Sequence, residues 1–471
     1  NLLNEIVGAN DVPGGAIGWP TRFMGFPETG HHQLTPSADP EGFLISGWWS
    51  PGQHKMWPLK DPKLPNTAPT MKDLFPWVVT SPFLAAADRK EWQEKTGMTA
   101  KLKAILNWGA NIPMSHPNKD EVAASLKEVP FIFSFRLFLD EYSDFCDIVL
   151  PDACYLESLF PTDNLDVGFS GPTGMTDWYF QIKQPVVEPQ FERRMAVEVL
   201  LELARRIDPK LVVAHYRVIN ERLDLREPYK LELDPAKKYT WEDICDRTFK
   251  SYFGEERGLE WFKQNGGIKW SKKVEEGFFR PFVKNLRSPI YYEWVVGWEE
   301  KIRKLAEPAG IQLDWRHYTP LPEYFPNPCH EVADPSYDIY GITYRDIIHT
   351  GSSTMQNPWI DEASQMNPYT YNVHISEEMG KKKGLKDGDA IWLEADNGRR
   401  VNGVIKLMQG IHPQVLGVTA CAGHWSPNLP IAKGKGTHFD DLLVIDKEHL
   451  DPVCLSMETT AKLKIYKADR R

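Results

Sequence analysis

The sequence lacks any C-x-x-C pair. Its six cysteines lie singly along 471 residues, at positions 146, 154, 245, 329, 421 and 454. Zinc sites and iron–sulfur clusters draw on closely spaced cysteines, so neither is expected within this chain. A disulfide framework is typical of small secreted domains and is not expected at this length. We therefore interpret the six thiols as free and mostly buried.

Long apolar runs and basic stretches are also missing. No run reaches the ~18 apolar residues of a membrane-spanning helix. The formal net charge is -10, and the one short basic run, at 381–383, lies at the end of an expected helix, where cations complement the helix dipole. A nucleic acid partner is therefore not expected. Hydrophobic residues make up 42% and charged residues 25%, an ordinary globular composition whose length favours roughly three domains.

Residues 103–151 alternate short apolar strands with helices. Strands are predicted at 103–108, 131–135 and 146–151. Between them lie a loop at 109–118, a helix at 119–129 with Asn118 as its N-cap, and a helical turn at 138–145. This alternation predicts an α/β fold with a doubly wound parallel sheet. Ligands of such sheets lie beyond the carboxyl ends of the strands, which here carry Asn111, Arg136 and Asp152. An amphipathic helix is predicted at 193–207.

Residues 336–471 are predicted to be mainly β. A strand at 337–348 leads into HTGSSTMQN, His349–Asn357. A helix at 376–384, capped by Ser376, is flanked by strands at 372–375, 415–423 and 460–468 and by a hairpin at 386–407, whose two strands are joined by an Asp-Asn-Gly turn. Short strands around one helix predict a small closed β-barrel, of the double-psi type. The predicted divisions are a tail of an upstream α/β domain at 1–30, an α/β domain with irregular Trp- and Pro-rich insertions at 31–335, and the barrel at 336–471. Because the first residues predict a helix running into a Gly-rich turn, the chain is expected to begin within a domain, with any targeting segment upstream.

Five segments together carry a family resemblance. They are VGANDVPGGAIG, LNWGANIPMSHP, SDFCDIVLPDACYLES, HTGSSTMQN and VHISEEMGKKKGLKDGDAIWLEADNG. In this order and spacing the chain resembles the C-terminal half of the catalytic subunit of the molybdopterin oxidoreductase, or dimethyl sulfoxide reductase, family. Its loop style is nearest to the polysulfide, thiosulfate and tetrathionate reductase branch, which resembles phenylacetyl-CoA:acceptor oxidoreductase. The chain departs from the family pattern at Ile112, where Pro is usual, and at Cys146, where Ala is usual.

The resemblance implies two molybdopterin guanine dinucleotides that hold one molybdenum or tungsten ion. Their pyrophosphates need backbone N–H groups and hydroxyl donors, and their guanines need carboxylate or amide partners. The residues that it assigns to cofactor binding are Asn111, Arg136, Asp152, His349, Thr350, Gly351, Ser352, Ser353, Asn357, Trp425 and Asn428. It places the metal ligand and a 4Fe-4S cluster in the N-terminal half of the family's catalytic chain, or in a partner, so no residue here is assigned as a metal ligand.

Each of these assignments has a structural alternative. The segment 349–357 could be an ordinary turn whose Ser and Thr side chains bond to local backbone. Asn111 could be a loop residue in a left-handed conformation, Asp152 a helix cap, and Arg136 the partner of Asp140 or Glu141. His424 is the one catalytic candidate, since imidazole titrates near neutrality and could move protons near the metal; the alternative is a buried structural histidine.

The function implied by the resemblance is a two-electron oxidation or reduction, by oxygen-atom transfer or by hydroxylation with water. The implied partners are a small-molecule substrate, an N-terminal half or a separate chain with the metal ligand, a ferredoxin-like iron–sulfur subunit, and a membrane anchor subunit. The alternative is a cofactor-free scaffold, as in a large subunit of respiratory NADH:quinone oxidoreductase. The resemblance leaves the substrate, the metal and the compartment open.

Overall fold

A computed structural model describes residues 2–9, 12, 14–15, 37–38, 44–45, 74–75, 103–161, 178–223, 225–270, 293–321, 323–445, 449, 451–454 and 456–468. The chain forms two compact units, one of residues 1–55 with 151–291 and the other of residues 56–150 with 292–471. Most of the Trp- and Pro-rich stretch at 31–90 lies outside the described residues, so its predicted irregularity stays a prediction, as do the predicted domain boundaries. Within the described part of the chain, no helix is both long and apolar enough to cross a membrane.

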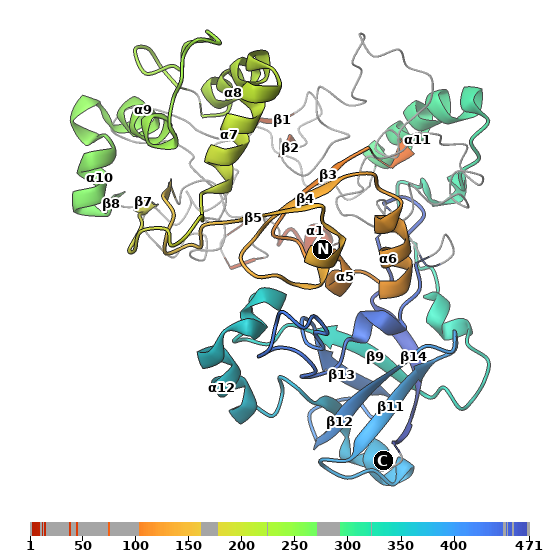
Figure 1. The fold of residues 1–471 in the computed structure, drawn as a ribbon. Helices are drawn as coiled ribbons and strands as arrows, with labels where there is room; N and C mark the ends of the chain where they lie inside the picture. The colour runs from red at the N-terminus through yellow and green to blue at the C-terminus, as the bar shows by residue number, and fades with distance from the viewer. Residues whose placement is uncertain are drawn as a thin grey trace. The chain divides into compact units, whose positions relative to one another are not determined.

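The second unit begins with the predicted α/β sheet (Figure 1). Its strands lie in the order β3 (Ile105–Trp108), β4 (Ile132–Arg136), β5 (Ile148–Pro151), and β3 pairs with β4 in parallel. The connecting segments are α5 (Ile112–Ser115), α6 (Lys119–Lys127) and the 3-10 helix η2 (Glu141–Phe145). Ile105, Val122, Leu126 and Ile132 form the buried core between sheet and helices. The predicted strands and helix are confirmed.

Two local features of this part follow from single residues. Asn118 caps α6 as predicted, because its side chain accepts a hydrogen bond from the backbone N–H of Glu121. The predicted loop at 109–118 was wrong in one respect, since it contains the short helix α5. Pro113 lies in the first turn of α5, where its fixed φ suits a helix and its missing N–H leaves no bond unmade.

The rest of this unit contains a closed barrel of six strands, which confirms the predicted barrel. Around the barrel the order is β10 (Val373–Ser376), β12 (Arg400–Met408), β11 (Ala390–Ala395), β14 (Thr460–Lys467), β9 (Ile339–Tyr344) and β13 (Val415–Thr419). The pairs β10–β12 and β13–β9 are parallel, and the other four are antiparallel. The barrel is filled by alternate, inward-facing side chains such as Ile391, Leu393, Leu463 and Ile465.

The helix predicted at 376–384 is α13 (Glu377–Lys383). Ser376 caps its first turn by accepting from the N–H of Met379, and Gly384 ends it in the left-handed conformation. The strand predicted to run to 348 is shorter than expected, because β9 ends at Tyr344. The following segment forms the 3-10 helix η9 (Ser352–Gln356) and then α12 (Pro358–Met366). The remaining elements of this unit are α11 (Glu293–Ala306), η6 (Glu307–Ala309), η7 (Trp315–His317), η8 (Pro328–Glu331) and η10 (Phe439–Leu442).

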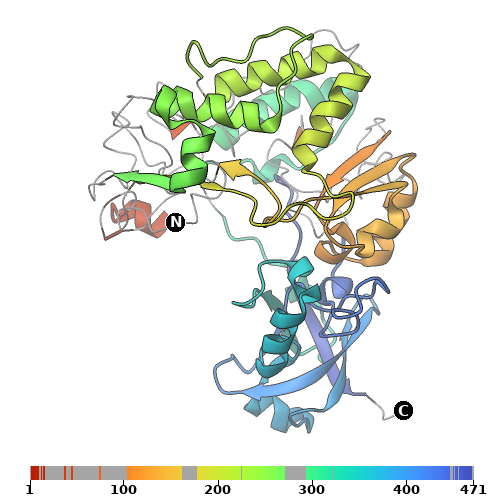
Figure 2. The same ribbon diagram turned by 60° about the vertical axis from the view of Figure 1, so that its left-hand side comes forward.

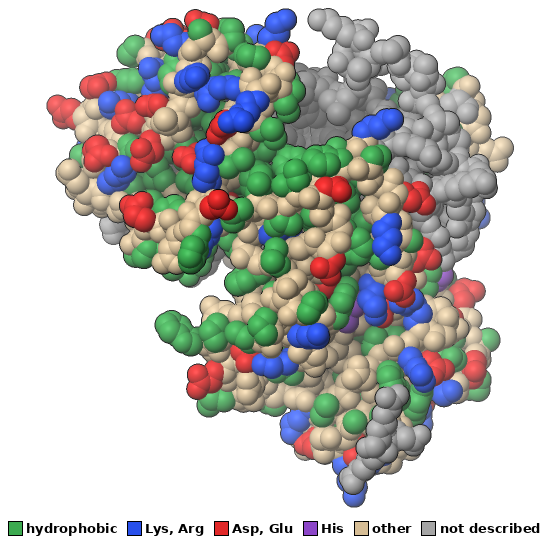
Figure 3. Space-filling model, viewed as in Figure 1, with side chains coloured by type: hydrophobic (Ala, Val, Ile, Leu, Met, Phe, Trp, Pro, Cys, Tyr) green, Lys and Arg blue, Asp and Glu red, His purple; other side chains and the backbone are tan. Residues whose placement is uncertain are grey.

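The first unit is mainly helical in its described residues (Figures 1 and 2). Its core gathers around the fully buried Phe180, whose ring meets those of Phe249, Tyr252, Phe253 and Phe262 edge-on. Acidic and basic side chains are interspersed over the face of this unit seen in Figure 3. Its elements are α1 (Leu2–Ile6), β1 (Ser37–Ala38), β2 (Leu44–Ile45), β6 (Phe160–Pro161), β7 (Trp178–Lys183), α7 (Ala196–Ile207), α8 (Pro209–Arg222), α9 (Trp241–Phe253), η4 (Glu255–Arg257), α10 (Leu259–Asn265) and β8 (Gly267–Trp270). The helix predicted at 193–207 is confirmed as α7.

Candidate functional site

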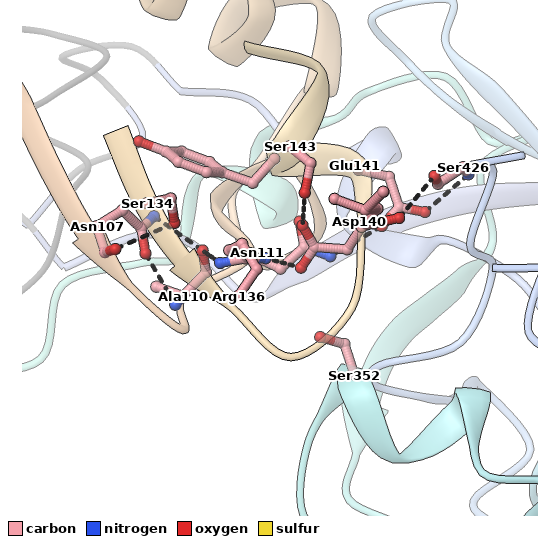
Figure 4. Close-up of polar contacts among 12 residues, drawn as sticks. Asn107, Ala110, Asn111, Ser134, Arg136, Asp140, Glu141, Ser143, Ser352 and Ser426 are labelled. Atoms are coloured by element: carbon pink, nitrogen blue, oxygen red, sulfur yellow. Dashed lines mark hydrogen bonds and ion pairs between the residues drawn. The ribbon is translucent and has the colours of Figure 1, made fainter. Parts of the chain in front are cut away.

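A buried carboxylate joins the α/β sheet to the barrel within the second unit. Glu141, the first residue of η2, is 1% exposed. Its Oε1 accepts hydrogen bonds from the backbone N–H groups of Trp425 (2.9 Å) and Ser426 (3.0 Å). Both of its oxygens lie 3.0 Å from Nδ1 of His424, and Oε2 also accepts from Nδ2 of Asn111 at 2.8 Å. Figure 4 shows this carboxylate reaching from the sheet side toward Ser426. The barrel loop 424–426 is therefore bonded to Glu141 at three consecutive residues.

The ionised form of Glu141 is strongly favoured. Burial by itself raises the pKa of a carboxyl group, because it penalises the charge. Here the hydrogen bond and charge of His424, with the bonds from Asn111 and Ser426, outweigh burial and hold the pKa of Glu141 at about 2. The carboxylate is thus charged at neutral pH, and it can act in this site only as an acceptor.

His424 lies between two acceptors. Its Nδ1 faces Glu141, and its Nε2 lies 3.1 Å from the backbone oxygen of Ser352. Only a doubly protonated imidazole can donate at both nitrogens at once. The ring is 2% exposed, so neither bond is replaced by bulk water. His424 therefore ties the Glu141 carboxylate to the start of η9.

Asn111 has one half of its amide paired and the other half free. Glu141 offers only acceptors, so the amide NH₂ of Asn111 must face it, as the 2.8 Å contact indicates. Its Oδ1 is then buried, and within the described part of the chain no partner reaches it. The residue is 7% exposed and has φ −100°, so the alternative of a left-handed loop Asn is wrong. A buried acceptor without a donor is costly and calls for a ligand or an ordered water.

Arg136, at the end of β4, is already engaged. Its guanidinium forms an ion pair with Asp140 and donates to the backbone oxygen of Ala110 at 2.8 Å. Asp140 also accepts from the hydroxyl of Ser143 at 3.3 Å (Figure 4). The salt-bridge alternative for Arg136 therefore describes the structure, with Asp140 as the partner. Much of its positive charge is neutralised before any ligand arrives.

These side chains surround a small cavity of about 50 Å³. The cavity brings together five of the predicted site residues, from the strand ends of the sheet, from η9 and from the barrel loop. Its lining residues are Gly109, Asn111, Arg136, Leu137, Phe138, Asp140, Ser352, Ser353, His424 and Leu429. The lining residues include Ser352, Ser353 and Asn111, and the buried Oδ1 of Asn111 has no partner among the described residues.

The other predicted residues of the segment 349–357 have local partners. His349 is buried, with Nδ1 2.8 Å from the Thr354 hydroxyl and Nε2 2.8 Å from the Ser364 hydroxyl. Asn357 caps α12, because its Oδ1 accepts from the first N–H groups of that helix. The backbone oxygen of Thr350 accepts from Arg345 at 2.7 Å. Gly351 is extended, and a Cβ added there would meet no atom within 4 Å.

The last three predicted residues, Asp152, Trp425 and Asn428, also lie outside the cavity. Asp152 belongs to the other unit, where its Oδ1 accepts from the N–H of Ala196 at the start of α7, as the capping alternative expects. The Trp425 ring packs against the His438 ring at a tilt of 46°, with centroids 5.0 Å apart, and Asn428 is exposed. The cofactor roles of all these residues stay predictions. In the described residues, no group of three or more His, Cys, Asp and Glu could hold a metal ion.

Sequence reasoning missed Glu141 as the centre of the site. It entered only as a candidate partner of Arg136. The available signal was a carboxylate in the turn that follows a parallel strand and leads into the CDIVLP strand. That signal does not distinguish Glu141 from Asp140. Only the fold shows that Asp140 pairs with Arg136 while Glu141 reaches the barrel loop.

Comparisons with known proteins agree with this fold. Residues 83–206 match the family described as Molybdopterin oxidoreductase. The chain is 23% identical over 405 residues to a sulfite dehydrogenase chain of Allochromatium vinosum, covering 75% of this chain and 40% of that protein. It is 23% identical over 333 residues to the molybdopterin-containing chain PhsA of the Salmonella typhimurium thiosulfate reductase, covering 69% and 38%. The chain thus spans about two fifths of the length of these relatives.

Among solved structures, the acetylene hydratase of Pelobacter acetylenicus shares the fold. It superposes with a TM-score of 0.54 at 17% identity and covers 84% of this chain and 51% of that one. The family match covers the α/β sheet and reaches α7 of the other unit, and the relatives extend it over most of the chain. On these grounds the chain is a homologue of the catalytic subunits of the molybdopterin oxidoreductase, or dimethyl sulfoxide reductase, family.

Proposed function

We propose that this chain is part of the catalytic subunit of a molybdenum- or tungsten-dependent oxidoreductase that carries two molybdopterin guanine dinucleotides. The observation that carries the proposal is the buried, unpaired Oδ1 of Asn111. Its residue lines a cavity together with the ends of β3 and β4 and with Ser352 and Ser353. When bound, the cofactor supplies the two-electron redox chemistry, by oxygen-atom transfer or by hydroxylation with water. The residues of this chain bind and orient it.

The donor set fits one part of such a cofactor. A guanine or pterin presents N–H groups on one edge, and Asn111 Oδ1 offers them an acceptor. The Ser352 and Ser353 side chains and the open space at Gly351 suit close approach of a pyrophosphate. Because Arg136 is paired with Asp140, a phosphate here would be met by hydroxyl and backbone N–H donors rather than by a free guanidinium.

His424 has a more restricted role than a free acid–base group. Its two ring nitrogens face Glu141 and Ser352, so proton transfer to a ligand would require one of these bonds to break. We therefore assign His424 to holding η9 against the cavity, with proton transfer as a second role of the same ring. Its contacts with Glu141 and Ser352 are consistent with the burial of the ring.

The remaining parts of the enzyme would come from sequence that this chain does not contain. Its relatives are about two and a half times as long as the matched region, which leaves room for a metal ligand and a 4Fe-4S cluster in an N-terminal half or a separate chain. A ferredoxin-like iron–sulfur subunit would carry electrons, and a membrane anchor subunit would tether the assembly. One of the relatives is a chain of a thiosulfate reductase. This supports a small sulfur compound as the substrate.

A second candidate function is a cofactor-free scaffold in a respiratory redox complex. The observation that favours it is the number of predicted binding groups already satisfied inside the protein. Arg136, His349 and Asn357 all have partners within the chain. A scaffold would leave the Asn111 acceptor to an ordered water.

Metal and pterin analysis separates the two functions. The chain, produced with its full subunit in cells that make the cofactor, should contain stoichiometric molybdenum or tungsten and release a fluorescent pterin on acid oxidation. Absence of both in a folded preparation rejects the proposed enzyme function.

Gly351→Val should lower cofactor content without lowering the thermal midpoint, since a Cβ at this extended glycine meets nothing within 4 Å. The matched control is Gly297→Val, at another glycine where an added Cβ meets no atom; it should leave cofactor content unchanged. Full cofactor content in the Gly351 variant would remove that residue from the site.

A further inference from the structure

The side chain with the most influence on the cavity does not line it. Glu141 lies behind Asn111, and its carboxylate collects donors from Asn111, His424, Trp425 and Ser426. Because an ionised carboxylate can only accept, every group that faces Glu141 must turn a donor toward it. Glu141 therefore controls which way the Asn111 amide faces.

The orientation of that amide determines the chemistry of the cavity. With NH₂ toward Glu141, Asn111 turns an acceptor, Oδ1, to its other side. If the amide were reversed, the same position would present a donor. A ligand edge with N–H groups matches the first arrangement and is mismatched with the second.

We propose that Glu141 is a positioning residue that sets the hydrogen-bond polarity of the cavity, holding Asn111 as an acceptor for the N–H edge of the ligand. This deepens, and rests on, the proposed binding of a pterin dinucleotide. It goes beyond that proposal by assigning ligand selectivity to a side chain that does not touch the ligand. The same carboxylate holds the loop 424–426, so both walls of the cavity depend on it.

The variant Glu141→Gln tests the proposal with little change in shape. The Gln oxygen should occupy the Oε1 position, where the N–H groups of Trp425 and Ser426 and the ring of His424 all donate. Its NH₂ then faces Asn111 and forces that amide to reverse, which places a donor at the cavity. We expect cofactor retention to fall about tenfold or more, the penalty of one mismatched buried hydrogen bond.

An exchange of the two side chains provides the rescue. In the double variant Glu141→Gln with Asn111→Asp, the new carboxylate accepts from Gln NH₂ and keeps an acceptor for the ligand. The net charge of the pair is unchanged, and the variant Asn111→Asp alone places two carboxylates 2.8 Å apart. If Glu141 served only folding, the double variant would regain cofactor only to the extent that it regains thermal stability.

The readouts are metal and pterin content per chain and the thermal midpoint, measured on the full subunit. The matched control is Glu128→Gln, at an exposed carboxylate at the end of α6, which should leave both unchanged. Loss in the single variant and restoration in the double variant support the proposal. Wild-type cofactor content in Glu141→Gln, or no restoration in a folded double variant, overturns it. Absence of cofactor from the wild-type subunit instead rejects the proposed function, and this inference with it.

Discussion

Replacing Glu141 by Ala removes the acceptor shared by four donors of the second unit. The change leaves His424, two backbone N–H groups and the Asn111 amide buried without their partner. Breaking a buried ion pair by removing one member costs about 3–5 kcal/mol. We expect the free energy of unfolding to fall by that amount. At about 2–4 °C per kcal/mol for a domain of comparable size, the thermal midpoint should fall by roughly 6–20 °C.

The assay is calorimetric or fluorescence-detected thermal unfolding of the full chain. The exposed carboxylate Glu128, replaced by Ala, is the matched control and should change the midpoint little. A shift for Glu141→Ala no larger than that of the control would refute the reasoning. It would mean that the loop 424–426 is held by other contacts.

The pH dependence of stability provides a second test, which concerns the direction of the pKa shift of Glu141. The folded-state pKa of Glu141 is about 2, below its ordinary value of 4.5. A depressed carboxyl pKa adds stability above the unfolded-state pKa, and that stability is lost as pH falls through the folded-state pKa. The stability difference between wild type and Glu141→Gln should therefore be constant above about pH 4.5 and shrink from there toward pH 2. A difference that does not change in this range would contradict the ionised carboxylate.

Three further predictions concern the barrel part of the second unit. Ser376→Ala removes the cap of α13 and should cost about 1 kcal/mol in chemical denaturation, whereas Ser376→Thr should cost less. Gly341→Ala places a methyl group 2.6 Å from the Phe439 ring and should cost about 1–3 kcal/mol; an unchanged denaturation midpoint would mean that the ring has room to move. Burial raises the pKa of Asp440 to about 6, so its charged form is disfavoured in the folded state, and stability should rise as pH falls through 6. Asp440→Asn should therefore stabilise the protein at pH 8 more than at pH 5, and equal effects at both pH values would refute the shift.

Local sequence patterns predicted the elements of the second unit closely. The caps Asn118 and Ser376 were predicted because an N-cap bonds within its own first turn, so its partners are three residues away. The barrel strands were predicted because inward and outward side chains alternate along each strand. The end of β9 was misplaced, because the predicted strand ran on through the apolar pair Ile347 and Ile348, whereas the strand ends at Tyr344.

The candidate site was predicted less completely than the fold. Asn111, Ser352, Ser353 and His424 were named from the resemblance, and the structure brings them to one cavity. Arg136 was named as a binding group, but it is paired with Asp140 four residues along the chain, an alternative that the spacing had left open. Asp152 was placed with them because strand ends of a parallel sheet share an edge, yet it caps a helix of the other unit.

The sequence by itself determined the order of the strands and helices, the caps and the family resemblance, because these depend on residues close together in the chain. Only the tertiary structure decided that Glu141 is the centre of the site. Its bonds to His424 and Ser426 join residues 283 and 285 positions apart. No local pattern encodes such a contact, since it exists only after the sheet and the barrel loop have packed together. The burial that accompanies this packing then turns one carboxylate among many into the group that orients Asn111 and His424.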